Sequence, residues 1–538
     1  MPGFRSALQV VTRPRRLVVI VTLLLAASGG LLRAEGKRSF VAGVNYPWIA
    51  YGHDFGKNAW GHDGLITSGW TYQTWFDSQG LVDTRVSTKK ARSGAGSLEI
   101  TPDLVGKHPT KSRGEVYIDL NNHRPPGTPV PIDVRHATVS CWLYLPRGSA
   151  GDARRAPNGV QFFFKSGKGF KSHYTVYQNI SGDQEERWVR FTADASTGES
   201  DAEYDPTKVV AVGLKIGINS DSGATLTAPI YVDDFVIGTT PPITFDFEQL
   251  EIDRDFAILQ QALGGCSTPA VRVFVFTDGR ASPELTFSDQ VTGLDEYFFQ
   301  DFDALLESAA RHKLKIIPVL LDFHWFDAAK DENGAQLGGR SNVIRNSVRR
   351  QSFLENALEP LVRRYCGNPA ILAWDVINEP EWATKELPDK PTVDAVPLAE
   401  MQEFVRAVAS TIHSSCPGQT VTVGSARRQW LQSWSGLGLD LYQFHWYDWM
   451  AAAEPFPWLP YAQLALDKPA VVGEVATATT GHTTQDFLMS AADSGYQGLL
   501  VWSYRAGDDR SDYANARSML ESWCGAIPRR RSVRSSND

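Results

Sequence analysis

Two glutamates stand where short apolar runs of the sequence stop. Glu379 follows the run Ala-Trp-Asp-Val-Ile-Asn at 373–378 and precedes Pro380, and Glu474 follows Pro-Ala-Val-Val-Gly at 469–473. A short apolar run closed by proline is typical of a buried strand. In parallel α/β barrels, the carboxyl ends of the strands open onto the ligand site. Two carboxyl groups there can break a glycosidic bond, because one can protonate the leaving oxygen while the other attacks the anomeric carbon.

The elements that must position these glutamates alternate between strand and helix over the second half of the chain. With a first strand at 39–48, the apolar runs predict eight strands, the others being at 271–276, 314–321, 371–377, 420–424, 441–445, 470–474 and 498–502. Helical spacing of apolar residues predicts helices at 252–263, 301–312, 351–366, 398–414, 484–494 and 511–523. Eight such units predict an α/β fold, a (β/α)8 TIM barrel. Strands four and seven then face each other across its mouth, which can bring the two carboxyl groups to about 5–5.5 Å.

A different pattern separates the first strand from the first helix. Between 64 and 238 the chain gives short alternating runs divided by Gly, Pro, Asn and Asp, which predicts a β-sandwich inserted after the first barrel strand. The predicted organisation is a signal peptide at 1–34, the first barrel strand at 35–56, the inserted β-sandwich at 57–240, the remaining barrel at 241–526 and a basic tail at 527–538.

Four strand ends in this order resemble the retaining glycoside hydrolases of clan A, most closely family 5. They are Asn378-Glu379-Pro380, His445-Trp446-Tyr447, Glu474 and Trp502, and the resemblance covers roughly 39–56 and 241–524. It implies that Glu379 is the general acid/base and Glu474 the nucleophile.

The same resemblance implies roles for further residues. Arg272 would pair with Glu474 and lower its pKa, Tyr447 would hydrogen-bond the nucleophile and line the pocket with His445, and Asn378 would bond the sugar 2-hydroxyl. Trp502 would lie under the sugar at the cleavage point, and His324 roughly matches a histidine at the third strand end. Candidate sugar platforms, or alternatively ordinary packing residues, are Trp48, Trp325, Trp382 and Trp449. Asp278 and Arg280 could contact substrate hydroxyls or make a turn.

The inserted segment resembles jelly-roll carbohydrate-binding modules, in the motifs Ser-Gly-Ala-Gly-Ser-Leu at 93–98 and Asp-Asp-Phe-Val at 233–236. A concave sugar-binding face or a hydrophobic core could be built from Trp142, Tyr144, Phe163, Tyr174 and Trp188. Asp233 and Asp234 could hold a calcium ion or cap a strand end.

Composition restricts the class of protein. With 42% hydrophobic and 21% charged residues in 538, the chain has the profile of a soluble globular enzyme. The first 34 residues hold five arginines, no acid and an apolar stretch at 17–27, which predicts a signal peptide, an uncleaved anchor being the alternative. Its removal takes the formal charge from −8 to −13, which disfavours nucleic acid as a partner. The five cysteines lack metal-ligand spacing, so no zinc site is expected, and one or two disulfides could form.

These observations together predict a secreted or periplasmic retaining β-glycoside hydrolase that cleaves a β-linked glucan or mannan by double displacement. We expect a monomer without metal, cofactor or stable membrane insertion. Two alternatives stay open at this point: an exo-acting β-glycosidase, with the insert closing one end of the cleft, and a polysaccharide-binding protein that no longer turns over substrate.

Overall fold

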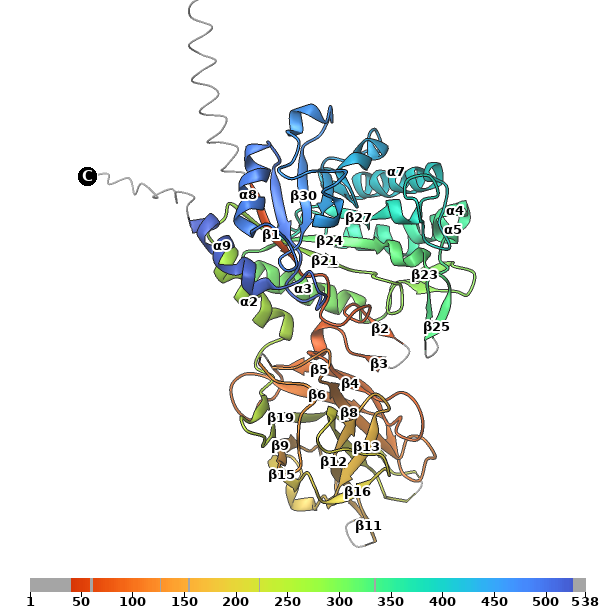
Figure 1. Ribbon diagram of the computed structural model, residues 1–538. Coiled ribbons are helices and arrows are strands. Elements are labelled where there is room, and N and C mark those ends of the chain that lie inside the picture. Colours follow the sequence, from red (N-terminus) through yellow and green to blue (C-terminus); the bar gives the residue numbers. More distant parts are fainter. Residues whose placement is uncertain are drawn as a thin grey trace, which may run out of the picture.

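The protein consists of a barrel and a pair of antiparallel sheets beside it (Figure 1). The computed structural model describes residues 40–525 except 59, 60, 126, 153, 154, 222, 333 and 334. The predicted signal peptide at 1–34 and the basic tail at 527–538 lie outside the described residues.

Eight parallel strands close into a barrel, which confirms the predicted (β/α)8 fold class. In barrel order they are β1 (Val41–Asn45), β21 (Thr268–Phe274), β24 (Lys315–Asp322), β27 (Trp374–Asn378), β28 (Val421–Ser425), β29 (Tyr442–Trp446), β30 (Ala470–Val475) and β31 (Gly498–Val501). β31 pairs with β1, so the sheet closes on itself. Each strand overlaps one of the eight predicted runs.

Helices surround this barrel and bury their apolar faces on it. They are α2 (Glu251–Leu263), α3 (Phe298–Arg311), α4 (Asn342–Arg345), α5 (Ser347–Phe353), α6 (Glu359–Arg364), α7 (Leu398–Ser415), α8 (Thr484–Asp493) and α9 (Tyr513–Gly525). The predicted helix at 351–366 is divided, because a π-helical turn at Leu354–Leu358 joins α5 to α6. After β28 the described chain forms the 3-10 segment η6 (Arg428–Trp434).

The inside of the barrel changes from apolar to polar along the strands. Ala270, Ile317 and Leu500 form an apolar layer, and two residues beyond Ala270 on the same strand the inward side chain is Arg272. Gly424 leaves room for that guanidinium, since a Cβ there would lie 2.6 Å from Nη2 of Arg272. The polar layer therefore lies at the carboxyl ends of the strands, where the two glutamates are.

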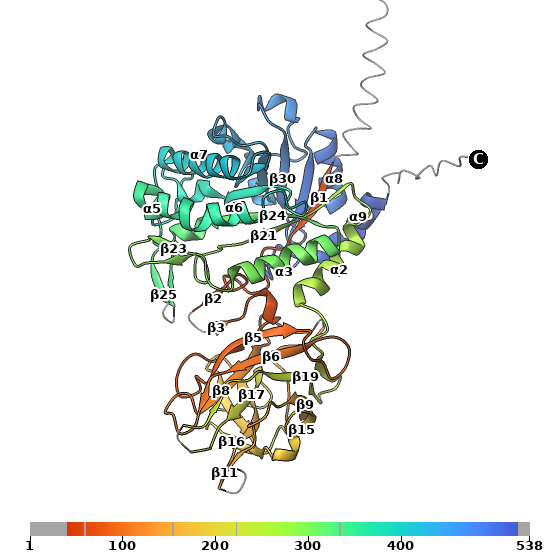
Figure 2. The same cartoon turned by 180° about the vertical axis from the view of Figure 1, so that it is seen from behind.

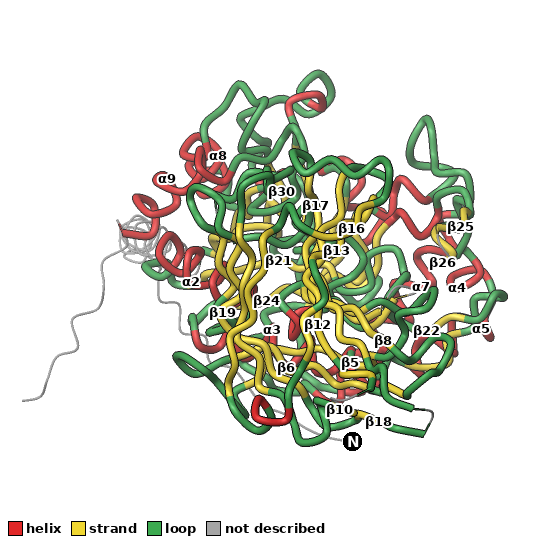
Figure 3. Tube along the Cα trace, turned by 90° about the horizontal axis from the view of Figure 1, so that it is seen from below, coloured by secondary structure: helices red, strands yellow, loops and turns green. Residues whose placement is uncertain are grey.

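Two antiparallel sheets follow β1 and share one apolar core. The larger sheet has the order β16 (Gly198–Ser200), β13 (Lys171–Thr175), β12 (Gly159–Ser166), β17 (Val209–Gly217), β8 (Arg113–Asp119) and β4 (Trp70–Tyr72), with β14 (Gln178–Asn179) beside β12. The smaller has the order β15 (Trp188–Asp194), β9 (Thr138–Tyr144), β19 (Ile230–Ile237), β6 (Ser97–Pro102) and β5 (Leu81–Ser87), with β20 (Ile243–Phe245) beside β19. Figure 3 views this sandwich in front of the barrel. The boundaries at 57 and 240 stay a prediction.

Five two-stranded ribbons complete the described strands. They are β2 (Lys57–Asn58) with β3 (Gly61–His62), β7 (Leu104–Val105) with β18 (Thr225–Leu226), β10 (Gly151–Asp152) with β11 (Ala156–Pro157), β22 (Glu284–Leu285) with β23 (Val291–Gly293), and β25 (Lys330–Glu332) with β26 (Ala335–Leu337).

Buried charges hold the sandwich side of the chain against the barrel helices. Asp301 on α3 accepts hydrogen bonds from the backbone N–H groups of Gly56 and Ile66 at 2.9 and 3.0 Å, and it lies 3.0 Å from Nε2 of His62. His123 lies 2.9 Å from Glu251 on α2. In Figure 2, β5 and β6 lie directly beneath α3. These contacts fix the sandwich on the side of the barrel formed by α2 and α3.

Four of the five cysteines form disulfides. Cys266, after α2, bonds to Cys524 in α9, and Cys366, after α6, bonds to Cys416 at the end of α7. Cys141 is a free thiol buried in the sandwich. The first disulfide joins the beginning of the helical layer to its end, a pairing that the spacing of the cysteines in the sequence did not indicate.

Candidate active site

Glu379 and Glu474 face each other across the barrel mouth. Glu379 directly follows β27 with φ 46° and ψ 48°, a left-handed conformation that is uncommon outside glycine, and Pro380 then begins the 3-10 turn η5 (Pro380–Ala383). Glu474 lies within β30. One carboxylate oxygen from each glutamate and a ring nitrogen of His445 all lie within 4.8 Å of one another. This spacing agrees with the separation of about 5–5.5 Å between the two carboxyl groups of retaining glycosidases. It is shorter than the separation of about 6.5–9.5 Å in inverting ones.

Arg272 is the centre of the polar layer. Its fully buried guanidinium donates to Oε1 of Glu474 at 2.6 Å and, through Nη2, to Oδ1 of Asn378 at 2.8 Å. It also donates to Asp375 at 2.9 Å and to Asn45 at 3.0 Å. The predicted pairing of Arg272 with Glu474 is thus present, and the arginine cannot rotate away without breaking contacts to three other strands.

Asp375 fixes Arg272 from behind and was not a predicted site residue. Its Oδ1 accepts from the backbone N–H of Gly424 at 2.9 Å, and its Oδ2 accepts from Gln443 at 2.8 Å. The sequence offered one signal for it: a single acid within an apolar strand has to find a partner inside the barrel.

The second oxygen of Glu474 is held by Tyr447, whose hydroxyl donates to it at 2.6 Å. Burial raises the pKa of Glu474, while Arg272 and the Tyr447 hydrogen bond act in the opposite direction. The expected lowering by Arg272 is therefore present, but burial outweighs it. Glu474 still has what the other glutamate lacks, a direct contact with a permanent cation, and this contact favours its ionised form.

Glu379 is surrounded by neutral donors. The indole Nε1–H of Trp382 donates to its Oε2 at 2.8 Å, and Nδ1 of His445 lies 2.8 Å from its Oε1. Burial lowers the pKa of His445 to about 4, so this ring is neutral near pH 7. Burial also raises the pKa of Glu379 itself, against the effect of the Trp382 hydrogen bond. Burial thus raises the pKa of both carboxyl groups, and of the two only Glu474 bonds directly to a guanidinium.

The Glu379–His445–Glu474 group is also spaced closely enough to ligate a metal ion. The donors argue for a different use, because Arg272 and Tyr447 already bond both oxygens of Glu474. A guanidinium in contact with a ligand oxygen repels a second cation.

Aromatic side chains flank the glutamates on two sides. On one side, Trp382 packs against Trp430 and Trp449 at centroid distances of 5.4 and 6.2 Å, and the guanidinium of Arg427 lies 4.7 Å from the Trp449 ring. Trp430 and Arg427 were not predicted, although they lie in the loop after the fifth barrel strand, where pocket residues are expected.

On the other side, Trp48 lies 6.2 Å from Trp502 and 4.8 Å from Tyr51. Trp502 donates its indole N–H to Asp508 at 2.7 Å. His324 is half-exposed, and its Nδ1 lies 2.6 Å from Asp327, with its ring 6.4 Å from that of Tyr51. In barrel order, Trp48 and Trp502 follow the neighbouring strands β1 and β31, across the barrel from β27 and β28, which Trp382 and Trp430 follow, while His324 follows β24 between them.

For three sets of residues that the sequence left with two alternatives, the structure disfavours one of them. Trp325 has no exposed surface and packs in the barrel core, so it cannot be a sugar platform. The five aromatics proposed for one face of the sandwich lie on both sheets: Trp142, Tyr144 and Trp188 on the smaller, Phe163 and Tyr174 on the larger. Asp233 accepts backbone N–H bonds from Arg92, Ser93 and Asp234, which is the strand-capping alternative rather than a calcium site.

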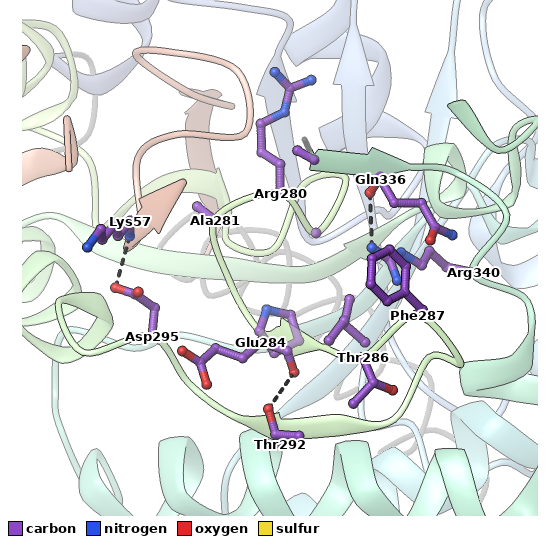
Figure 4. Close-up of a pocket in the computed structure, with 14 residues that line it drawn as sticks. Lys57, Arg280, Ala281, Glu284, Thr286, Phe287, Thr292, Asp295, Gln336 and Arg340 are labelled. Atoms are coloured by element: carbon purple, nitrogen blue, oxygen red, sulfur yellow. Dashed lines mark hydrogen bonds between the residues drawn. The ribbon is translucent and has the colours of Figure 1, made fainter. Parts of the chain in front are cut away.

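Arg280 lies beside the mouth, at the border of a separate cavity of about 610 Å³ (Figure 4). It forms an ion pair with both carboxylate oxygens of Asp278. The cavity is lined by the loop that follows β21, including Glu284, Thr286 and the exposed ring of Phe287. Neither Glu379 nor Glu474 lines it.

Comparison with known proteins points to one class of enzyme. No family model matches the chain. It is 28% identical to a mannan endo-1,4-beta-mannosidase of Mytilus edulis over 45% of this chain and 74% of that protein, and 27% identical to one of Cryptopygus antarcticus over 49% and 76%. Among solved structures, the β-mannanase of blue mussel Mytilus edulis matches with a TM-score of 0.43 and 24% identity, covering 52% of this chain and 84% of that one. The curated relatives confirm the predicted class, a β-glycoside hydrolase, and agree with the resemblance to family 5.

Proposed function

We propose that this β-glycoside hydrolase is a retaining endo-β-mannanase in which Glu379 is the acid/base and Glu474 the nucleophile. The observation that carries the proposal is the carboxylate pair within 4.8 Å with a guanidinium on Glu474 alone. Mannan as the substrate rests on the two curated relatives, whose names state mannan endo-1,4-beta-mannosidase activity.

The reaction proceeds in two displacements. In the first, Glu474 attacks the anomeric carbon while Glu379 gives its proton to the glycosidic oxygen, so that the leaving chain departs as an alcohol and a glycosyl ester forms on Glu474. In the second, Glu379 takes a proton from a water molecule whose oxygen attacks the same carbon, and Glu474 is released as a carboxylate. Arg272 holds Asn378 through its Oδ1, and one amide N–H of Asn378 donates to Asp322 at 3.4 Å, which leaves the second N–H for the sugar 2-hydroxyl.

Endo action is supported by the aromatic residues on both sides of the glutamates. Trp382, Trp430 and Trp449 can stack with sugars on one side of the cleavage point, and Trp48 and Trp502 on the other. An exo-acting enzyme needs such surfaces on one side only.

Export of the protein is part of the proposal. Two disulfides support it, because disulfides persist in oxidising compartments. Within residues 40–525, the described helices include none that is long and apolar enough to span a bilayer.

The test uses galactomannan, glucomannan, β-glucan and xylan with the wild type, Glu474→Gln and Glu379→Ala. We expect reducing ends from the mannans, with products that first carry the β-anomer by NMR, and no turnover by Glu474→Gln. With an activated aryl mannoside, azide should restore turnover of Glu379→Ala, because azide needs no general base. Products that first carry the α-anomer, or an active Glu474→Gln, would contradict the assigned roles.

A further inference from the structure

A cavity of about 950 Å³ lies between the larger sheet of the sandwich and the loops of the barrel. Tyr117 on β8, Lys165 on β12 and Tyr174 on β13 line it from the sheet, and Arg280 and Glu332 line it from the barrel. In Figures 1 and 2, the ribbons containing β2 and β25 extend from the barrel toward the sandwich. The cavity therefore belongs to both parts of the chain.

Strand alternation decides which side chains enter it. On β8, Val116 and Ile118 lie in the core that the two sheets share, while Glu115 and Tyr117 lie on the outer face with the cavity. The outer face of this sheet thus carries polar and aromatic residues where solvent or a ligand must meet them.

Two charged groups in the cavity lack the partner that their burial calls for. Glu115 is 2% exposed; its Oε1 accepts from the Tyr174 hydroxyl at 2.8 Å and from Ser78 at 3.2 Å, but its Oε2 has no hydrogen-bond partner. Lys165 is 9% exposed, and its ammonium lies 5.0 Å from the Tyr117 ring without an ion-pair partner within 4.0 Å in the part of the chain that the structure describes. Buried groups of this kind are normally satisfied, so the pair is poised for a ligand.

The lining fits a neutral sugar. A hydroxyl group can accept from the Lys165 ammonium and donate to the free oxygen of Glu115, which no single-function group can do. Aromatic rings that can pack on the apolar faces of a pyranose surround these charges: Trp75, Phe76, Tyr117, Phe170 and Tyr174. Phe76 is 75% exposed and Phe170 42%. The lining carries five carboxylates and two formal cations, which disfavours a polyanion.

A line of contacts leads from this cavity to the catalytic mouth. The Arg280 guanidinium lies 5.7 Å from the ring of Tyr51, Tyr51 lies 4.8 Å from Trp48, and Trp48 lies 6.2 Å from Trp502.

We propose that the cavity is a second glycan-binding site, which holds the neutral β-linked chain whose other end lies in the catalytic mouth. The identity of that glycan as mannan rests on the proposed function.

The test compares Lys165→Met and Trp75→Ala with Trp142→Ala, a half-buried tryptophan of the smaller sheet that does not line the cavity. Binding is measured by affinity electrophoresis in gels containing galactomannan, glucomannan, β-glucan or xylan, with every variant also carrying Glu474→Gln to prevent hydrolysis. Turnover is measured, with Glu474 intact, on galactomannan and on 4-nitrophenyl β-mannobioside, and thermal unfolding reports folding.

We expect Lys165→Met to bind the polysaccharide about tenfold more weakly, the effect of losing one hydrogen bond to a charged group. Trp75→Ala should also weaken binding severalfold, because it removes a ring that packs on the sugar. The ratio of kcat/KM for galactomannan to that for the mannobioside should fall by a similar factor, while Trp142→Ala keeps both values. Unchanged binding in both cavity variants, or an equal loss in Trp142→Ala, overturns the inference. A protein that binds a polysaccharide through the cavity but hydrolyses none contradicts the proposed function and leaves the cavity site standing.

Discussion

The hydrogen bond from Trp382 to Glu379 should set the alkaline limit of activity. Trp382→Phe keeps most of the ring and removes the N–H that lies 2.8 Å from Oε2 of Glu379. That bond lowers the pKa of Glu379, so its loss should raise the pKa. A hydrogen bond to a charged group contributes about 1.5–3 kcal/mol. At about 1.36 kcal/mol per pH unit, the shift should be about one to two units upward.

The assay is the pH dependence of kcat/KM on galactomannan between pH 4 and 10. Because the acid/base must enter the reaction protonated, the alkaline limb reports the higher apparent pKa of the Glu379–Glu474 pair in the free enzyme. Trp430→Phe is the matched control, since Trp430 packs edge-on against Trp382 and makes no hydrogen bond to Glu379. An alkaline limb that stays in place, or moves to lower pH, in Trp382→Phe would refute the assignment of Glu379 as the proton donor.

Three further outcomes test the buried charges and the crosslinks. Arg272→Met should lower the free energy of unfolding by about 3–5 kcal/mol, because it leaves buried carboxylates unpaired. Arg135→Met, which removes an exposed ion pair with Asp133, should cost far less in the same urea titration. Burial lowers the pKa of His62, but Asp301 outweighs this and raises it to about 9. The stabilisation from this pair should be complete below about pH 6.5 and lost as the pH rises through about 9, and Asp301→Asn should flatten that part of the stability profile. Removing the first disulfide (Cys266→Ser with Cys524→Ser) should lower the free energy of unfolding by about 1.5 kcal/mol more than removing the second (Cys366→Ser with Cys416→Ser), because the two bonds close loops of 258 and 50 residues. Equal losses of stability in calorimetry would contradict this chain-entropy explanation.

The sequence alone was sufficient to predict the barrel and the residues at the ends of its strands. Burial along a strand is a local property, so the runs before Glu379 and Glu474 could be recognised without knowing their neighbours. The end of a parallel strand also has a fixed place in a barrel, and the resemblance to family 5 supplied the expected roles of Arg272, Tyr447 and Trp502.

Where a local pattern had two meanings, the tertiary structure decided between them. Trp325 and Trp382 are both tryptophans just beyond a barrel strand, yet one is buried in the core and the other donates a hydrogen bond to Glu379. Alternation placed Phe163 in a strand, but only the sheet order showed that it lies on a different sheet from Trp142. Hydrophobic periodicity predicts that a side chain is buried, but it does not predict which residues that side chain packs against.

Contacts between distant segments likewise came only from the folded chain. The four bonds of Arg272, the pairing of Cys266 with Cys524, and the cavity shared by Lys165 and Arg280 each join residues separated by about a hundred positions or more. Their geometry depends on how the barrel closes and how the sandwich docks on α2 and α3. The sequence therefore determined which residues could perform the chemistry. Barrel closure decided which of them meet at the site, because only closure sets the distances between side chains that are far apart in the chain.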